Sequence, residues 1–278
     1  MKPLRRLIPI FLLAMNAQPA GFFLQMSDPQ FGMYSENRDF AQETVNFEFA
    51  VATANRLRPK FVVVCGDLIN QAGNTAQVAE YQRIAAKLDP AIKLYNVAGN
   101  HDVGNEPTPA TLKAYREKFG ADYYSFTSDG LEGFVLNSSL IATPLQAPAE
   151  AERQEAWLTA ALAKPRAAGV RFRVIFQHHP WFLEKADEPD QYFNIPTATR
   201  MRYLKLFHES GVTHIFAGHY HRNTYGREGE LQMITTGPVG KFLGNDPSGM
   251  RVVTWSEAGM DHQYYGLGSI PHEIPIGN

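Results

Sequence analysis

Two histidines stand one residue apart in the segment AGHYHRN, at positions 219 and 221, directly after a glycine and an apolar run. In an extended chain, residues two apart project to the same face, so His219 and His221 can reach toward one point. Paired imidazoles directed at one point are typical of a metal site, whereas an isolated pair can equally mark a polar turn at a strand end. The rest of the chain has to distinguish these two interpretations.

Four further apolar runs end in groups that bind metals or move protons. They are FFLQMSDPQ, ending at Asp28; FVVVCGD, at Asp67; LYNVAGNHD, at Asn100, His101 and Asp102; and RVIFQHHP, at His178. In open α/β sheets the ligand crevice lies at the carboxyl ends of the strands, so side chains far apart in the sequence can converge there. Glycine comes just before a polar candidate at positions 66, 99 and 218, where the missing Cβ permits close approach to a bound ion. We therefore predict one site built from all five strand ends.

The elements that must position these residues alternate along the chain. Apolar runs predict strands near 22–26, 61–65, 93–97, 133–137, 172–176 and 213–217, and a three- to four-residue apolar period predicts helices over about 40–57, 75–88, 108–119, 149–163 and 197–210. Beyond Gly218, the segments LQMITTG, RVVTWSE and DHQYYGL predict short antiparallel strands without helices. This order is typical of a layered α/β fold, and no linker or repeat divides residues 21–278 into further domains.

The overall charge and the cysteine content exclude several classes of protein. The net charge of −2 gives no broad attraction for nucleic acid or for an anionic membrane, so we expect no nucleic-acid partner. The single cysteine, Cys65, excludes a disulfide framework within the chain and any cysteine-rich metal site. Because the net charge is small, any phosphate recognition should depend on a local site and not on the overall charge.

The N-terminal segment is typical of an export signal. Lys2, Arg5 and Arg6 precede the apolar run 7–15 and the small residues of NAQPA, which predicts a signal peptide over residues 1–20 and a periplasmic or secreted protein. The apolar run is too short to span a bilayer, so no stable membrane anchor is expected. The alternative is a cytoplasmic protein with an N-terminal extension.

The ordered pattern of Asp28, GD at 66–67, GNHD at 99–102, His178 and GHYH at 218–221 resembles the calcineurin-like metallophosphoesterases. DPQFG, CGDLI, GNHDVGN, YFN and GHYHRN resemble, more narrowly, the calcineurin-like phosphoesterase domain-containing protein phosphatase type. The resemblance implies a metallophosphoesterase-type α/β fold, a β-sandwich of two mixed sheets flanked by helices, over residues 21–278. It also implies two metal ions, one held by Asp28, Asp67 and His221 and the other by Asp67, Asn100, His178 and His219.

Oxygen and nitrogen donors without thiolate suit Mn, Fe or Zn and do not choose among them. Gln30 departs from the pattern, because most members carry histidine two residues after the first aspartate. Its amide oxygen is a weaker donor than imidazole, so it either completes the shell of the Asp28 ion or does not ligate at all.

The resemblance implies hydrolysis of phosphoesters by a hydroxide that bridges the two ions. His101 would protonate the leaving oxygen, and Asp102 would hold the tautomer of His101. We expect phosphomonoesters as substrates, either small organic phosphates or phosphoserine and phosphothreonine in proteins. The alternatives are a phosphodiesterase acting on nucleotides or lipids and a non-catalytic protein that binds a single metal. The acidic loop 184–190 and the following QYFN are expected to form a wall of the cleft, and His179 is expected to point away from the site.

Overall fold

Two mixed β-sheets form the centre of the structure, a computed structural model that describes residues 21–276. The predicted signal peptide therefore lies outside the described residues. The first sheet has the strand order β11-β10-β1-β2-β3, with β1, β2 and β3 parallel and β10 and β11 antiparallel. Its strands are β1 (Gly21–Met26), β2 (Phe61–Val64), β3 (Lys93–Asn96), β10 (Gly249–Trp255) and β11 (Met260–Gly266).

The second sheet has six strands in the order β4-β5-β6-β7-β9-β8. They are β4 (Tyr124–Ser128), β5 (Leu131–Val135), β6 (Phe172–Phe176), β7 (Val212–Ala217), β8 (Thr224–Glu228) and β9 (Leu231–Thr235). The four inner strands run parallel to one another, while the edge strands β4 and β8 pair antiparallel with their neighbours. The carboxyl ends of β6 and β7 therefore reach the same edge of this sheet.

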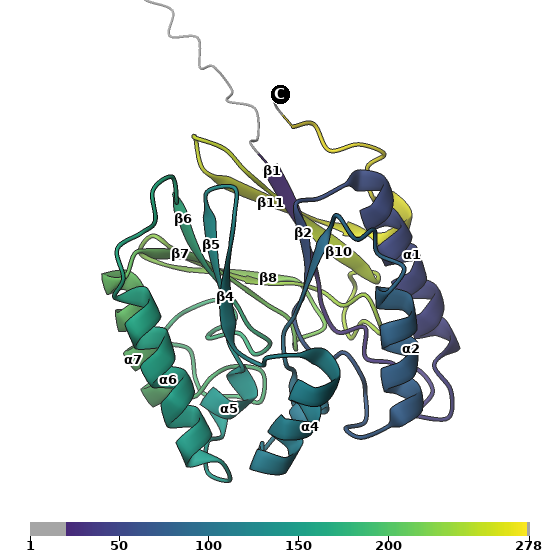
Figure 1. The fold of residues 1–278 in the computed structure, drawn as a ribbon, viewed down its shortest axis with the longest axis horizontal. Helices are drawn as coiled ribbons and strands as arrows, with labels where there is room; N and C mark the ends of the chain where they lie inside the picture. The colour runs from purple at the N-terminus through teal and green to yellow at the C-terminus, as the bar shows by residue number, and fades with distance from the viewer. Residues whose placement is uncertain (1–20, 277–278) are drawn as a thin grey trace, which may run out of the picture.

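Helices cover the outer face of each sheet (Figure 1). They are α1 (Ala41–Leu57), α2 (Thr75–Ala85), α3 (Asn100–Val103), α4 (Pro109–Phe119), α5 (Ser138–Ala142), α6 (Pro148–Leu162) and α7 (Thr197–Glu209), and the 3-10 helix η1 (Leu267–Ser269) follows β11. Buried side chains of α1, α2 and α4 pack on the five-stranded sheet, and those of α6 and α7 pack on the six-stranded sheet. The two mixed sheets flanked by helices confirm the predicted fold class.

Alternation along each strand divides the apolar side chains between the layers. In β1, Phe22 and Leu24 face the helices, whereas Phe23 faces the other sheet. In β2, Val62 faces the helices and Val63 the other sheet. Successive side chains of a strand point to opposite faces, so a strand covered on both sides reads as a continuous apolar run. Burial on both faces explains the apolar composition from which β1 and β2 were predicted.

The last quarter of the chain differs from the prediction. LQMITTG, RVVTWSE and DHQYYGL do form strands, which are β9, β10 and β11, but these strands divide between the two sheets. β9 runs parallel to β7, whereas β10 pairs antiparallel with β1 and carries β11. The C-terminal segments thus complete both sheets, and they do not add one separate antiparallel sheet.

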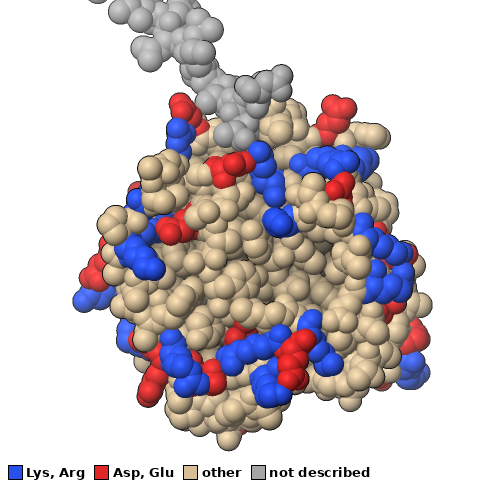
Figure 2. All heavy atoms as spheres, in the orientation of Figure 1, with Lys and Arg blue, Asp and Glu red and all other residues tan. Residues whose placement is uncertain are grey.

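Charged side chains do not form a continuous patch of one sign on the face drawn in Figure 2. Lysine, arginine, aspartate and glutamate side chains are interleaved around the periphery, and the centre of this face carries few of them. Within residues 21–276, no helix combines the length and the hydropathy needed to cross a membrane.

Candidate metal centre

Residues that follow five different strands meet between the carboxyl ends of the two sheets. Asp28, Asp67 and Asn100 come after β1, β2 and β3 of the five-stranded sheet. His178, His219 and His221 come after β6 and β7 of the six-stranded sheet. One sheet therefore supplies every oxygen donor of the predicted set, and the other supplies every imidazole.

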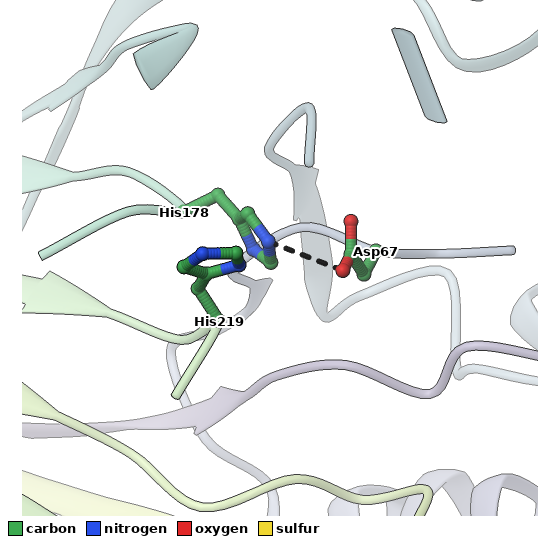
Figure 3. A group of neighbouring side chains, drawn as sticks. All are labelled: Asp67, His178 and His219. Carbon is green, nitrogen blue, oxygen red and sulfur yellow. Dashed lines mark ion pairs between the residues drawn. The ribbon is translucent and has the colours of Figure 1, made fainter. Parts of the chain in front are cut away.

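Two groups of potential metal ligands share one residue. Ligand atoms of Asp67, His178 and His219 all lie within 4.8 Å of one another, and so do those of Asp28, Asp67 and His221. Figure 3 shows His178 and Asp67 facing each other with His219 beside them. The Nε2 atom of His178 lies 3.2 Å from an oxygen of Asp67 and 3.0 Å from the amide oxygen of Asn100. The structure thus brings the six residues together in two adjoining groups, with Asp67 common to both.

Backbone carbonyls fix the orientation of the three imidazole rings. The Nδ1 atom of His178 donates to the carbonyl of Cys65 at 2.8 Å, and that of His221 donates to the carbonyl of Lys241. The Nε2 atom of His219 lies 3.2 Å from the carbonyl of Tyr192. Each ring thereby keeps its other nitrogen free for the centre, which is the usual arrangement of metal-binding histidines.

Most of the candidate ligands occupy a backbone conformation that residues with a Cβ rarely adopt. Among the described residues nine non-glycine residues have positive φ, and five of them belong to this site: Asp28, Gln30, Asp67, His219 and His221, with φ between 43° and 68°. Such conformations persist where the surroundings impose them, and they cluster at functional sites. The strand exits are thus turned sharply toward the centre.

Two glycines are required by close approach of the loops. A Cβ atom added to Gly99 would overlap the backbone nitrogen of Asp67, and one added to Gly218 would overlap the hydroxyl of Ser27. Gly99 therefore lets the Asn100 loop lie against the Asp67 loop. Gly218 likewise lets the histidine loop lie against the loop of Asp28, whose carboxylate accepts the N–H of His219 at 3.1 and 3.2 Å.

The side chain of Gln30 fits a cation site. Its residue is 2% exposed, and its amide nitrogen donates to Asn70 at 3.1 Å. Its amide oxygen is buried without any hydrogen-bond partner. An unpaired buried carbonyl costs about 1–3 kcal/mol, so the oxygen needs a partner that the protein itself does not supply. A cation between Gln30 and the carboxylates of the neighbouring loops would provide one, and the donor set therefore fits metal ions.

The charges within the centre are strongly coupled. Burial raises the pKa of Asp67, but the adjacent His178 outweighs this effect and holds that pKa well below its usual value. Burial likewise lowers the pKa of His178, and the Asp67 carboxylate outweighs it and raises that pKa to about 9. Burial and the neighbouring His178 lower the pKa of His219 to about 4. Because a metal ligand must be deprotonated, a cation in this place competes with a proton for His178.

The predicted partnership between His101 and Asp102 is wrong. The Nδ1 atom of His101 lies 2.7 Å from the backbone carbonyl of Asn70. The carboxylate of Asp102 instead accepts the backbone N–H groups of Leu68, Ile69 and Gly99 at 3.2, 3.1 and 2.8 Å. Because a residue and its neighbour on a short helix point in different directions, adjacency in GNHD did not bring the two side chains together. Asp102 therefore ties the Asp67 loop to the Asn100 loop.

The QYFN segment lies beside the centre as predicted, whereas the predicted orientation of His179 is wrong. The rings of Tyr192 and Phe193, from the QYFN segment, lie 5.0 and 5.5 Å from the ring of His219. The predicted wall of the cleft thus consists of these aromatic rings. His179 does not point away, because its ring lies 4.2 Å from that of His219, and its Nδ1 atom lies 3.0 Å from the hydroxyl of Ser138.

Comparison with known proteins places this arrangement in a family. The chain matches the calcineurin-like phosphoesterase family over residues 23–223. It is 37% identical over 262 residues to serine/threonine-protein phosphatase CPPED1 of Homo sapiens, an alignment that covers 88% of this chain and 83% of the human protein. The chain therefore belongs to the calcineurin-like phosphoesterase family. It is a hydrolase of phosphoesters, and its activity depends on metal.

Solved structures share the fold at low sequence identity. A dimetal phosphatase from Danio rerio superimposes with a TM-score of 0.63 at 18% identity, covering 90% of this chain and 97% of that one. Purple acid phosphatase PPD1 from yellow lupin (Lupinus luteus) gives a TM-score of 0.65 at 13% identity, covering 89% and 52%. These likenesses show that the two-sheet architecture is common to phosphatases of different sequence.

Proposed function

We propose that the chain hydrolyses phosphomonoesters with two ions held in the adjoining groups, one by Asp28, Gln30, Asp67 and His221 and the other by Asp67, Asn100, His178 and His219. The observation that carries this proposal is the membership of Asp67 in both groups. A carboxylate has two oxygens, so one residue can serve two ions a short distance apart. Mn, Fe and Zn all suit these donors.

The residues around the ions have separate roles in this proposal. Two ions held by these residues would lower the pKa of a water molecule and would position the phosphate oxygens for its attack. His101 donates from Nδ1 to Asn70, so its Nε2 atom is free to carry a proton to the leaving oxygen. The Asp67 carboxylate accepts the backbone N–H of His101 at 2.8 Å, which fixes the main chain of the proton donor relative to the centre. Asp102 acts through the backbone of both loops.

The substrate is proposed to be a monoester, either a small organic phosphate or a phosphoserine or phosphothreonine side chain. The name of the human relative, a serine/threonine-protein phosphatase, supports the second kind. A phosphodiesterase would use the same ion-binding groups, so the donor set alone does not separate the two activities. The observation that favours catalysis over mere metal binding is the half-buried imidazole of His101 beside Asn100.

The decisive experiment reconstitutes the protein with Mn, Fe or Zn and measures metal content together with hydrolysis. p-Nitrophenyl phosphate and bis-p-nitrophenyl phosphate serve as monoester and diester, and a phosphoserine peptide serves as the protein-derived substrate. We expect two ions per chain and faster monoester hydrolysis. Asp67→Asn should lose both ions and the activity, whereas Asp129→Asn, at an exposed carboxylate, should keep them. Preference for the diester, or one ion per active chain, would contradict the proposal.

We also propose that the protein is exported after removal of residues 1–20. The basic residues, the apolar run and the small residues of this segment support export. The mature N-terminus, determined by mass spectrometry on protein from the native host, should lie close to Gly21. A native chain that still begins at Met1 in the cytoplasm would overturn this part of the proposal.

A further inference from the structure

A continuous row of aromatic rings and one guanidinium lies beside the metal centre. We call it the aromatic ledge and define it as Tyr192, Phe193, Tyr220 and Arg222. The ring centroids of Tyr192 and Phe193 are 5.2 Å apart, and those of Phe193 and Tyr220 are 4.9 Å apart. The guanidinium carbon of Arg222 lies 4.9 Å from the centroid of Tyr220. The four side chains thus form one connected surface.

The ledge begins at the metal centre. The ring of Tyr192 lies against His219, and its hydroxyl lies 3.4 Å from the amide nitrogen of Asn100. Asn100 directly precedes His101, the proposed proton donor. Tyr192 is nevertheless 60% exposed, and so offers a ring face to solvent. Because Asn100 and His219 are both proposed ligands of one ion, a phosphoester bound at that ion lies beside the ring of Tyr192.

The loop that carries Tyr192 is held rigidly. Arg200 is fully buried and donates to the carbonyls of Ala186, Glu188 and Ile195 at 2.8–3.1 Å. The Glu188 carboxylate accepts backbone N–H groups of its own loop and the amide of Asn194. Two acids of the expected acidic wall, Glu188 and Asp190, are thus used within the loop and at the start of α7. Little conformational entropy is left to lose when a ligand packs on Tyr192.

The far end of the ledge is equally fixed. Arg222 donates from Nε and one terminal nitrogen to the carbonyl of Leu243 at 3.1 and 3.0 Å, and from the other to the hydroxyl of Tyr220 at 3.0 Å. No carboxylate pairs with its guanidinium among the described residues. A guanidinium on an aromatic face without a neutralising partner favours a further π system alongside it.

We propose that the aromatic ledge binds a planar, ring-bearing leaving group, so that phosphomonoesters whose alcohol carries an aromatic ring a few bonds from the phosphate are preferred substrates. This inference rests on the proposed function. The phosphate faces the metal centre, the ester oxygen lies near His101, and the ring stacks on Tyr192 toward Phe193. Offset or edge-on ring contacts contribute beyond simple apolar burial, so the ledge distinguishes a flat ring from a saturated one of similar size.

The test compares 2-phenylethyl phosphate with 2-cyclohexylethyl phosphate. The two alcohols are similar in basicity and size, so their esters differ mainly in the planarity of the ring. We expect kcat/KM to favour the phenyl ester by about threefold to tenfold, the range that ring contacts supply. Tyr192→Ala should bring the ratio close to one, and Tyr192→Phe, which keeps the ring, should preserve it. Phe49→Ala, at an exposed ring on α1, is the matched control and should leave the ratio unchanged.

Binding separates failure of this inference from failure of the proposed function. Titration calorimetry of the metal-loaded protein with 2-phenylethylphosphonate and 2-cyclohexylethylphosphonate measures the same discrimination without turnover. If neither ester is hydrolysed and the phenyl phosphonate still binds more tightly, the monoesterase proposal fails and the ledge stands. Equal rates and equal dissociation constants for the two rings, or a ratio unchanged by Tyr192→Ala, would overturn the ledge.

Discussion

The Nδ1 atom of His101 lies 2.7 Å from the backbone carbonyl oxygen of Asn70. A carbonyl can only accept, so this contact places a proton on Nδ1 and leaves Nε2 for chemistry. The tautomer is set by the main chain of the loop after β2, where mutation of a side chain cannot remove the acceptor. The orientation of the proposed proton donor thus depends on the shape of that loop.

Substitutions at His101 and Asn100 should separate proton transfer from metal binding. His101→Ala should keep both ions and lose about 10²- to 10⁴-fold in kcat, because positioned proton transfer contributes that much. Asn100→Ala should lose metal and activity together, since its oxygen lies 3.0 Å from Nε2 of His178. Metal content and kcat are measured on the same preparations. Equal loss of metal in the two variants would contradict the division of roles.

Gln30 should control the affinity of the ion nearest Asp28. Gln30→Ala removes the unpaired buried oxygen. The dissociation constant of that ion should rise by about tenfold or more, because loss even of a residue that only supports a metal ligand has an effect of that size. Gln30→His should lower it, because imidazole is the stronger donor to a transition metal. Competition with a chelator measures both. Gln71→Ala, at an exposed amide in the same region, is the control, and an unchanged constant in Gln30→Ala would exclude ligation.

Asp102 should act on the stability of the two loops that it joins. Asp102→Asn replaces one accepting oxygen with an NH2 group facing backbone N–H donors, so at least one buried donor loses its partner. The free energy of unfolding should fall by about 1–3 kcal/mol. Urea unfolding measures it, with Asp261→Asn at an exposed carboxylate as the control. A fall in kcat without any loss of stability would show instead that Asp102 takes part in proton transfer.

His214 should make the folded protein sensitive to acid. It is 5% exposed, its Nε2 atom has no partner, and burial, with His262 next, lowers its pKa from 6.5 to about 4. His214 binds a proton more readily in the unfolded chain than in the folded one. Its contribution to the free energy of unfolding is therefore complete above pH 6.5 and is lost as the pH falls toward 4. This group alone contributes up to about 3 kcal/mol to that loss.

His214→Phe should remove this part of the pH dependence, because phenylalanine does not titrate and the ring stays between Phe172 and Phe216. Unfolding in urea between pH 4 and 7, with a chelator present to exclude effects of metal, gives the difference between the two proteins. That difference should grow as the pH falls. His272→Ala, at an exposed histidine, should follow the unmodified protein, and a difference independent of pH would contradict the assignment.

The strands buried on both faces were predictable, and so were the residues at their ends. β2 is a continuous apolar run, and β1, β6 and β7 are mostly apolar and buried, which is a strong signal in a single sequence. The edge strands β4 and β8 were missed, because YSFTS and TYGRE are short, half exposed and rich in polar residues. Their pairing depends on neighbours distant in sequence, and local composition does not reveal those neighbours.

The types of the candidate ligands were likewise predictable, whereas contacts made through the backbone were not. The sequence shows Asp102 next to His101, but the partner of each is a main-chain group whose position follows from the fold. Tyr192 stands 14 positions after His178 in a segment whose path depends on buried Arg200. QYFN was predicted to line the site, but the sequence did not show which of its side chains would contact His219.

The division of donors between the sheets links the integrity of the whole chain to its chemistry. If the two sheets separate, one keeps only the oxygen donors and the other keeps only the imidazoles. Neither sheet alone then binds an ion as tightly as the complete site. Ion affinity should therefore report the docking of one sheet on the other. For the same reason, added metal ions should raise the melting temperature. A chelator should weaken the docking of the two sheets before it disrupts the strands of either sheet.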